Sequence, residues 1–194
     1  MKKIGVLALQ GAVSEHTEIL ERCGVIPIEI KKPGQIDDID GLIIPGGESS
    51  TIGNLMNEYS FFEKTREFAS KGKPIYGTCA GLILMSKNII GENRKTISIM
   101  DIEVRRNAFG RQIDSMEIDI EIPKLGNKKF PAVFIRAPII EKIGKQVEIL
   151  AEIDDRIVMA QQKNLLVSAF HPELSNDDRI HRYFLNLVNK RWRQ

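Results

Sequence analysis

The feature that most constrains this chain is a cysteine between two glycines, at the junction of an apolar run and a helical pattern. The motif reads Gly77-Thr78-Cys79-Ala80-Gly81. Pro74-Ile75-Tyr76 precedes it and predicts a short strand, and Leu82-Ile83-Leu84-Met85 follows it and predicts a helix. A sharp turn from strand to helix strains the backbone of its central residue and requires neighbours without Cβ atoms. The pattern therefore predicts a nucleophile elbow with sulfur as the nucleophile.

The environment of Cys79 supports this interpretation over the alternative, a buried structural cysteine. The amino terminus of a helix carries partial positive charge and free N–H groups, which favour a thiolate. The other cysteine, Cys23, lies in no such context and is expected to be a packing residue. Two cysteines make no disulfide framework, so we expect a reducing, cytoplasmic environment.

Composition excludes several classes of protein. The chain has 194 residues, of which 42% are hydrophobic and 28% charged, which is typical of one soluble domain spanning residues 1–194. A formal net charge of +2 gives no reason to expect a nucleic-acid partner. No stretch approaches the roughly 18 apolar residues of a membrane span, so no membrane association is expected.

The order of patterns predicts the fold. Short apolar runs alternate with helical patterns in the first half, which is typical of a parallel sheet with crossover helices. The expected strands there are 4–9, 25–30, 41–44 and 75–77, and the expected helices are 13–23, 60–70 and 81–87. In the second half, 116–122 alternates as a strand with one wet face, strands are expected at 132–135, 147–152, 157–161 and 165–170, and an amphipathic helix at 177–191. We predict a single α/β domain with a mostly parallel, flavodoxin-like central sheet flanked by helices, and an added antiparallel strand region in the second half.

A second motif supplies partners for the cysteine. His171-Pro172-Glu173 follows the strand expected at 165–170. Proline favours extended backbone in the residue before it, and residues two apart on an extended chain project to the same side. A carboxylate beside an imidazole holds one ring nitrogen and leaves the other facing a nucleophile. We predict a Cys79–His171–Glu173 triad, although the tripeptide alone is also compatible with a turn carrying a surface ion pair.

A third motif is the loop Pro45-Gly46-Gly47-Glu48-Ser49-Ser50, after which a helix is expected to start near Thr51-Ile52. Adjacent glycines let backbone N–H groups approach a ligand closely, so Gly47 and Ala80 are the predicted donors of an oxyanion hole. A phosphate-binding loop and a purely structural turn are the alternatives. The pattern G-x-x-x-x-G-K-[ST] is absent, which argues against phosphate.

Several arginines lie near these segments without a strong signal of their own. Arg105, Arg106 and Arg111 surround residues 107–110, and Arg136 ends a predicted strand. An arginine that faces the pocket pairs bidentately with a carboxylate, but a solvated surface position is the default expectation for each.

The remaining histidines and the basic carboxyl-terminal cluster carry weaker signals still. His16 and His181 have no metal-ligand pattern around them and are expected to be surface or packing residues. The cluster is interpreted as a solvated helix face, with a nucleic-acid-binding tail as the weaker alternative. Its members are Arg179, Arg182, Lys190, Arg191 and Arg193.

With these motifs assembled, the chain resembles class I (triad) glutamine amidotransferase domains over essentially its whole length. The shared parts are the elbow 77–81, the loop 45–49 and the tripeptide 171–173. Within that class the chain is similar to the glutaminase subunits of pyridoxal 5'-phosphate synthase. This narrower resemblance rests on Leu9-Gln10-Gly11 with Glu15-His16, on Arg106-Asn107-Ala108-Phe109-Gly110-Arg111-Gln112, and on Phe134-Ile135-Arg136-Ala137-Pro138.

The resemblance implies hydrolysis of L-glutamine to glutamate and ammonia. Cys79 would attack the side-chain amide, and water would then cleave the resulting γ-glutamyl thioester. The resemblance implies no metal and no organic cofactor. The glutamine contacts that it implies are Gly47, Glu48, Ser49, Arg106, Ile135 and Arg136.

The resemblance also implies a protein partner. In this family the ammonia passes to a separate synthase subunit, which combines it with ribose 5-phosphate and glyceraldehyde 3-phosphate to make the vitamin B6 coenzyme. Free ammonia is mostly protonated at neutral pH and so a poor nucleophile, which favours direct coupling of the two sites. Docking activates the family's glutaminase through a backbone rearrangement that completes the oxyanion hole, and the matching residues Gln10 and Gly11 are the candidate switch.

Other functions remain open on the sequence. The same triad would serve a glutaminase that supplies a different synthase, and only the acceptor partner separates the two. A cysteine peptidase or chaperone-like protein with the same elbow is disfavoured by the 171–173 tripeptide and the loop at 45–49. A non-enzymatic regulatory module is disfavoured by the intact triad.

Overall fold

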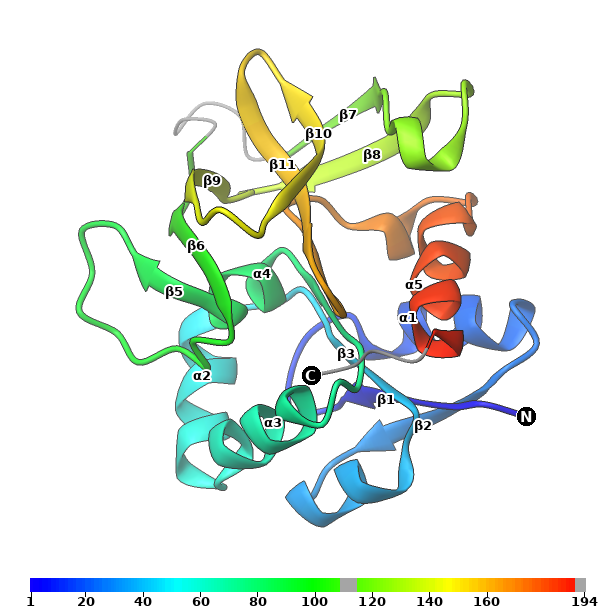
Figure 1. Ribbon diagram of the computed structural model, residues 1–194, viewed down its shortest axis with the longest axis vertical. Coiled ribbons are helices and arrows are strands. Elements are labelled where there is room, and N and C mark those ends of the chain that lie inside the picture. Colours follow the sequence, from blue (N-terminus) through cyan, green and yellow to red (C-terminus); the bar gives the residue numbers. More distant parts are fainter. Residues whose placement is uncertain (109–114, 191–194) are drawn as a thin grey trace.

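The computed structural model describes residues 1–108 and 115–190. Five parallel strands form one half of its main sheet (Figure 1). In spatial order they are β2 (Ile26–Ile30), β1 (Lys3–Leu7), β3 (Gly41–Ile44), β4 (Ile75–Thr78) and β12 (Leu165–Ser168). Counted along the chain, this is the 2-1-3-4-5 order of flavodoxin-like folds. The predicted α/β class and parallel core are confirmed.

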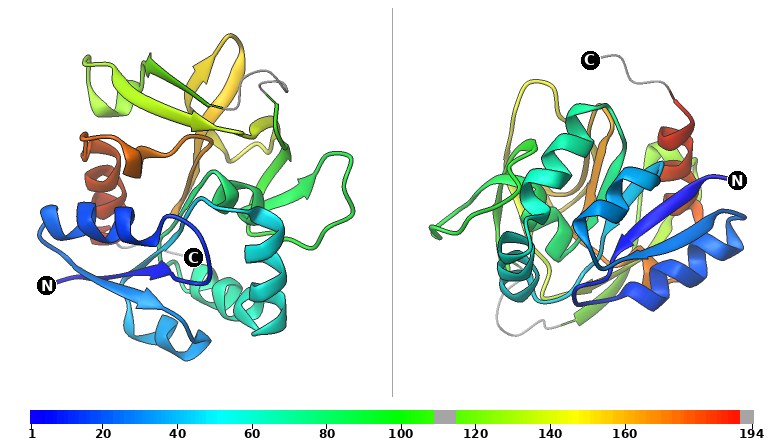
Figure 2. Two further views of the ribbon diagram at one scale, coloured as in Figure 1. Left: turned by 180° about the vertical axis from the view of Figure 1, so that it is seen from behind. Right: turned by 90° about the horizontal axis from the view of Figure 1, so that it is seen from below.

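Helices cover both faces of this parallel core. The elements are α1 (Val13–Arg22), η1 (Pro33–Asp38), α2 (Ser49–Glu58), α3 (Phe61–Ser70), α4 (Ala80–Met85) and α5 (Arg179–Asn189). Helices α1 and α5 lie side by side on one face, and α3 and η1 lie on the other (Figures 1 and 2). Right-handed crossovers account for α1 lying opposite α3 and η1, because the chain reverses direction across the sheet after β2.

The sheet continues past β12 with mostly antiparallel neighbours. In order these are β11 (Arg156–Gln162), β9 (Ile139–Ile143), β6 (Met100–Arg105) and β5 (Ser86–Ile89), and β10 (Glu148–Ile153) also pairs with β11. A separate antiparallel hairpin consists of β7 (Ser115–Ile120) and β8 (Phe130–Ile135). The short helices η2 (Pro123–Leu125) and η3 (Pro172–Leu174) complete the described elements. The predicted antiparallel region in the second half is confirmed.

Four details of the sequence prediction differ from the structure. Strands β5, β6 and β9 were not predicted, and the helix expected at 81–87 ends at Met85, where β5 takes over. The helix expected at 177–191 is α5, and Arg191 lies outside the described residues. The alternation at 116–122 predicts one buried face, yet Ile118 is 38% exposed. Within the described residues β7 pairs with β8 alone, and most of the buried face of this hairpin comes from Phe130, Ala132 and Phe134 on β8.

Close backbone contact fixes the junction between β4 and α4. A Cβ atom on Gly81 would lie 2.1 Å from the carbonyl oxygen of Ile44 on β3. One on Gly77 would lie 2.6 Å from the carbonyl carbon of Gly81. Real Cβ atoms do not approach so closely, so both positions require glycine for space. Helix α4 therefore starts directly against the sheet.

This close approach predicts that Gly81→Ala destabilises the fold. The new methyl group must push α4 away from β3, and overpacking of this kind costs about 1–3 kcal/mol. Chemical denaturation of both proteins measures the loss in free energy of unfolding. Gly34→Ala is the matched control, because its Cβ would meet no atom within 4 Å. An unchanged midpoint for Gly81→Ala would contradict the packing argument.

Candidate active site

The carboxyl ends of four neighbouring parallel strands converge on one pocket. Gln10 follows β1, the loop with Gly47 follows β3, Cys79 follows β4, and His171 follows β12. Together they line a pocket of about 320 Å³. Open α/β sheets bind ligands at this edge, where the strand order reverses. The other lining residues are Glu48, Ser49, Ala80, Ile83, Arg106, Asn107, Ile135 and Arg136.

Cys79 sits in a strained backbone conformation between β4 and α4. Its φ is 47° and its ψ is −97°, a backbone combination that residues other than glycine rarely adopt. The Cys79 N–H donates to the carbonyl oxygen of Ser168 at 2.8 Å, which ties the elbow to β12. Its Sγ lies 3.8 Å from the carbonyl oxygen of Ile135. The elbow thus holds the sulfur in the pocket, between the parallel sheet and the end of β8.

His171 and Glu173 form a buried pair beside this sulfur. His171 Nδ1 lies 2.8 Å from Glu173 Oε1, and both side chains are buried. The His171 N–H donates to the carbonyl oxygen of Val133 at 2.8 Å, which anchors the tripeptide to β8. Because Nδ1 faces the carboxylate, Nε2 is the nitrogen left for the pocket.

The surroundings of this pair set its charge. Burial lowers the pKa of His171, but hydrogen bonds with Cys79 and Glu173 outweigh burial and raise it to about 10. Burial raises the pKa of Glu173, but His16 and His171 outweigh that effect and hold it below its ordinary value. At neutral pH the imidazole is therefore protonated and the carboxylate ionised.

The segment after β1 and the glycine loop after β3 are bonded to each other. The Ala12 N–H donates to the Gly46 carbonyl oxygen at 3.0 Å, and the Glu48 N–H donates to Gln10 Oε1 at 2.8 Å. Gly11 lies behind the loop with φ +108°, where its Cβ would be 1.9 Å from the Gly46 oxygen. In a trans peptide the next N–H points opposite to the carbonyl. The Gly47 N–H is therefore directed by the bond that Ala12 makes with Gly46.

Glu48 caps helix α2 and reaches toward Arg106. Its carboxylate accepts from the N–H groups of Ser50 at 3.1 Å and Thr51 at 2.7 Å. Burial opposes its ionisation, but these hydrogen bonds outweigh burial and lower the pKa of Glu48 to about 2. Arg106 Nη2 lies 3.5 Å from Glu48 Oε1, and Arg106 Nη1 lies 3.2 Å from Glu92 Oε1. The guanidinium is thereby held at the rim of the pocket by two carboxylates.

The other arginines separate into different environments. Arg136 lines the pocket at a φ of 42°, just after β8. Arg105 pairs with Glu141 on the surface instead. Arg111 and the rest of segment 109–114 lie outside the described residues, as do Arg191 and Arg193.

The comparisons with known proteins agree with this geometry. The model of the SNO glutamine amidotransferase family matches residues 6–190. The chain is 55% identical over 188 residues to pyridoxal 5'-phosphate synthase subunit PdxT of Carboxydothermus hydrogenoformans, which covers 97% of this chain and 98% of the relative. It is 51% identical over 189 residues to the subunit of the same name from Desulforudis audaxviator, covering 97% and 100%.

The chain belongs to the SNO glutamine amidotransferase family. A solved structure described as a glutamine amidotransferase matches this one with a TM-score of 0.91 at 43% identity. The match covers 96% of this chain and 99% of that one. The resemblance drawn from the sequence motifs is confirmed at the level of the family.

Three residues near this amidotransferase site were not predicted to be there. His16 and His181, expected on the surface or in general packing, are both fully buried, and His16 lies 3.5 Å from Glu173. Glu92 holds Arg106 although it lies in a loop without a recognisable pattern. Each contact joins segments far apart in sequence, so no local spacing announces it. The only hint was the pair Glu15-His16 in the narrower resemblance.

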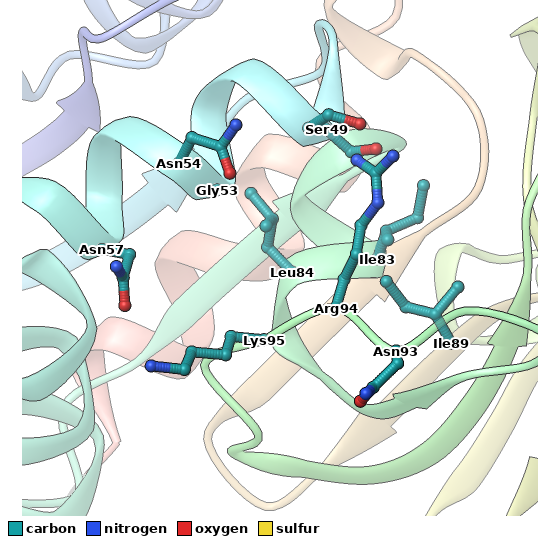
Figure 3. Close-up of a pocket in the computed structure, with 11 residues that line it drawn as sticks. Ser49, Gly53, Asn54, Asn57, Ile83, Leu84, Ile89, Asn93, Arg94 and Lys95 are labelled. Atoms are coloured by element: carbon teal, nitrogen blue, oxygen red, sulfur yellow. The ribbon is translucent and has the colours of Figure 1, made fainter.

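A second pocket adjoins the first (Figure 3). It has a volume of about 250 Å³ and shares Ser49 and Ile83 with the pocket that holds Cys79. Figure 3 shows Arg94, Lys95 and several amide side chains around it. Its lining includes no cysteine or histidine, so the nucleophile belongs to the first pocket alone.

Two further observations apply to the residues that the structure describes. They contain no group of three or more His, Cys, Asp or Glu side chains arranged to hold a metal ion. None of their helices has the length and apolar character needed to cross a membrane.

The depressed pKa of Glu48 predicts a pH-dependent contribution to stability. A carboxyl group whose pKa falls on folding stabilises the fold above its unfolded value, near 4.5, and loses that contribution as the pH falls toward 2. In Glu48→Gln this titration is absent. The difference in free energy of unfolding between wild type and variant should therefore shrink between about pH 6 and pH 3. A difference that stays constant across these denaturation curves would exclude Glu48 as the cause.

Proposed function

We propose that this chain hydrolyses L-glutamine to L-glutamate and ammonia and supplies the ammonia to a partner synthase subunit that makes pyridoxal 5'-phosphate. The observation that carries the proposal is the meeting of Cys79, at a strained elbow, with the buried His171–Glu173 pair in one pocket. Membership in the glutamine amidotransferase family supports the substrate, and the PdxT name of its relatives supports the pathway.

The first half of the reaction forms a thioester. The Cys79 sulfur attacks the side-chain carbonyl carbon of glutamine, and its proton passes to His171, whose raised pKa favours the imidazolium. The N–H groups of Gly47 and Ala80 stabilise the oxyanion that develops. The C–N bond then breaks, and His171 Nε2 gives its proton to the departing nitrogen, which leaves as ammonia.

The second half restores the enzyme. His171, now neutral, takes a proton from water as the water attacks the γ-glutamyl thioester. The C–S bond breaks, glutamate leaves, and the thiolate–imidazolium pair returns. Glu173 stays ionised throughout, since it holds the Nδ1 proton and stabilises the imidazolium.

Glutamine is held by residues on both sides of the sulfur. On one side the Gly47-Glu48-Ser49 segment lines the pocket, and on the other Ile135 and Arg136 do. Arg106 closes the rim, and a guanidinium there suits the substrate's α-carboxylate.

We propose that the whole chain acts as one glutaminase domain in the cytoplasm. Both cysteines are free, which is compatible with a reducing compartment. Because a free ammonia molecule is protonated at neutral pH, the synthase must receive it directly from this pocket. The candidate switch is the Gln10–Gly11 segment, which the partner would move on docking.

The nucleophile is tested by Cys79→Ala. Without the sulfur no thioester forms, so glutamate release from L-glutamine in the presence of the synthase subunit should fall below detection. Co-sedimentation with the synthase should be unchanged, because the side chain is buried in the pocket. Cys23→Ala is the matched control, and its turnover should equal that of wild type. Residual turnover by Cys79→Ala would exclude the mechanism.

The switch is tested by Gly11→Val. A side chain there collides with the Gly46 carbonyl, so the loop should lose its response to the synthase, and stimulation of glutamate release should fall at least about tenfold. Gly24→Val is the control, since its φ is also positive, at +78°, but its Cβ would meet no atom within 4 Å. Undiminished stimulation of the Gly11 variant would count against the segment as the switch.

A further inference from the structure

Two buried histidines lie behind Glu173 and have no part in the chemistry above. His16 on α1 and His181 on α5 are both 0% exposed. His16 Nδ1 lies 3.0 Å from His181 Nε2, a hydrogen-bond distance. On the other side of the same ring, His16 Nε2 lies 3.5 Å from Glu173 Oε2 and 3.3 Å from Thr78 Oγ1. The His16 ring therefore stands between the second histidine and the carboxylate that orients His171.

Burial decides the charge of both rings. It lowers the pKa of His181 well below its ordinary value. Burial also lowers the pKa of His16, although the nearby Glu173 opposes this. Each ring is then neutral at neutral pH and carries one N–H. Since one nitrogen of their hydrogen bond must donate and the other accept, only two arrangements of the protons fit the contact.

The surroundings distinguish these two arrangements. If His16 donated from Nδ1, its bare Nε2 would face the anionic Glu173 oxygen. His181 would then carry its proton on Nδ1, an atom that is buried without a hydrogen-bond partner among the described residues. An unpaired buried N–H and a lone pair facing a carboxylate are both costly. If His181 donates instead, the proton of His16 lies on Nε2 and points at Thr78 and Glu173.

We propose that His16 is a positioning residue for glutamine hydrolysis. Its Nε2–H holds the Glu173 carboxylate, and His181 keeps His16 in the tautomer that carries this proton. Glu173 Oε1 accepts from His171, whereas Oε2 is buried and makes no hydrogen bond in the described part of the chain, with His16 Nε2 3.5 Å away. The His16 N–H is thus the polar group that faces this oxygen and limits rotation of the carboxylate. A fixed carboxylate fixes the His171 ring against Cys79. The inference rests on the proposed roles of His171 and Glu173.

The position of His16 also connects the Glu173 carboxylate with the candidate switch, the Gln10–Gly11 segment. Helix α1 begins at Val13, two residues after Gly11, and His16 lies in its first turn. Thr78, which contacts His16, accepts a hydrogen bond from the Gly46 N–H at 2.9 Å. A movement of the Gln10–Gly11 segment on docking therefore reaches both the glycine loop and the carboxylate.

The test compares three variants at position 16 in the complex with the synthase subunit. The amide nitrogen of glutamine reaches the place of Nε2, whereas that of asparagine reaches only the place of Nδ1. His16→Leu and His16→Asn should lower kcat for glutamate release about 10- to 100-fold with KM for glutamine within twofold, because misplacing a catalytic group has effects of this size. His16→Gln should retain kcat to within a few-fold. Equal kcat values for the glutamine and asparagine variants would overturn the proposal, even if the leucine variant fails to fold.

Leu20→Ala separates positioning from general damage to α1. Leu20 lies one turn further along the same helix and is equally buried. Its truncation should lower the denaturant midpoint but leave kcat near that of wild type. A loss of kcat equal to that of His16→Leu would show that only the packing of α1 matters.

A double-variant cycle tests the role of His181. If His181 acts through His16, His181→Phe should lower kcat in the wild-type background and have no further effect in His16→Leu. Equal losses in both backgrounds would contradict the proposal.

The wild-type complex supplies the reference rate. Its failure to release glutamate would contradict the proposed function itself, whereas a wild-type kcat in His16→Leu would contradict this inference alone.

Discussion

The site depends on keeping one charge buried. Glu173 must stay ionised to hold the Nδ1 proton of His171, yet it lies where burial raises the pKa of a carboxyl group. An isolated buried carboxylate takes up a proton rather than remain charged. Here the protonated His171 on one side and His16 on the other oppose that tendency. Helices α1 and α5 lie on the same face of the sheet, and each contributes one of the two buried histidines behind this carboxylate.

A second constraint is the mutual fit of backbone segments. Gly46 and Gly81 both lie where no side chain fits, the first against His171 and the second against the Ile44 carbonyl. The same closeness makes the glycine loop responsive, since the Gly46–Gly47 peptide is oriented by the Ala12 N–H. A donor held by one hydrogen bond from a neighbouring segment changes direction when that segment moves. Rigidity at the elbow and adjustability at the loop therefore coexist within a few ångströms.

The sequence predicts well those elements and motifs that are formed by consecutive residues. The elbow around Cys79, the His-Pro-Glu tripeptide and the glycine loop each occupy a few consecutive residues, and the parallel strands are short runs with strong apolar character. Strand β6 was missed although its apolar residues Met100, Ile102 and Val104 alternate with charged ones, which is the local pattern of a half-buried strand. Strand β9 has no such alternation, and its pairing with β6 defines it. The positions of His16, His181 and Glu92 near the site could not be predicted from the sequence. Each depends on a contact between distant segments, and a histidine or glutamate alone carries no periodic signal.

The two halves of the sheet divide the work of the pocket. The parallel half ends in Cys79, the glycine loop and His171, which are the groups proposed for bond making and breaking. The antiparallel half delivers Arg106 at the end of β6, and the separate β7–β8 hairpin delivers Ile135 and Arg136 at the end of β8. These residues are proposed to hold the substrate. The halves meet where β11 pairs with β12 and where the His171 N–H bonds to β8. These hydrogen bonds therefore fix the proposed substrate-holding residues relative to His171.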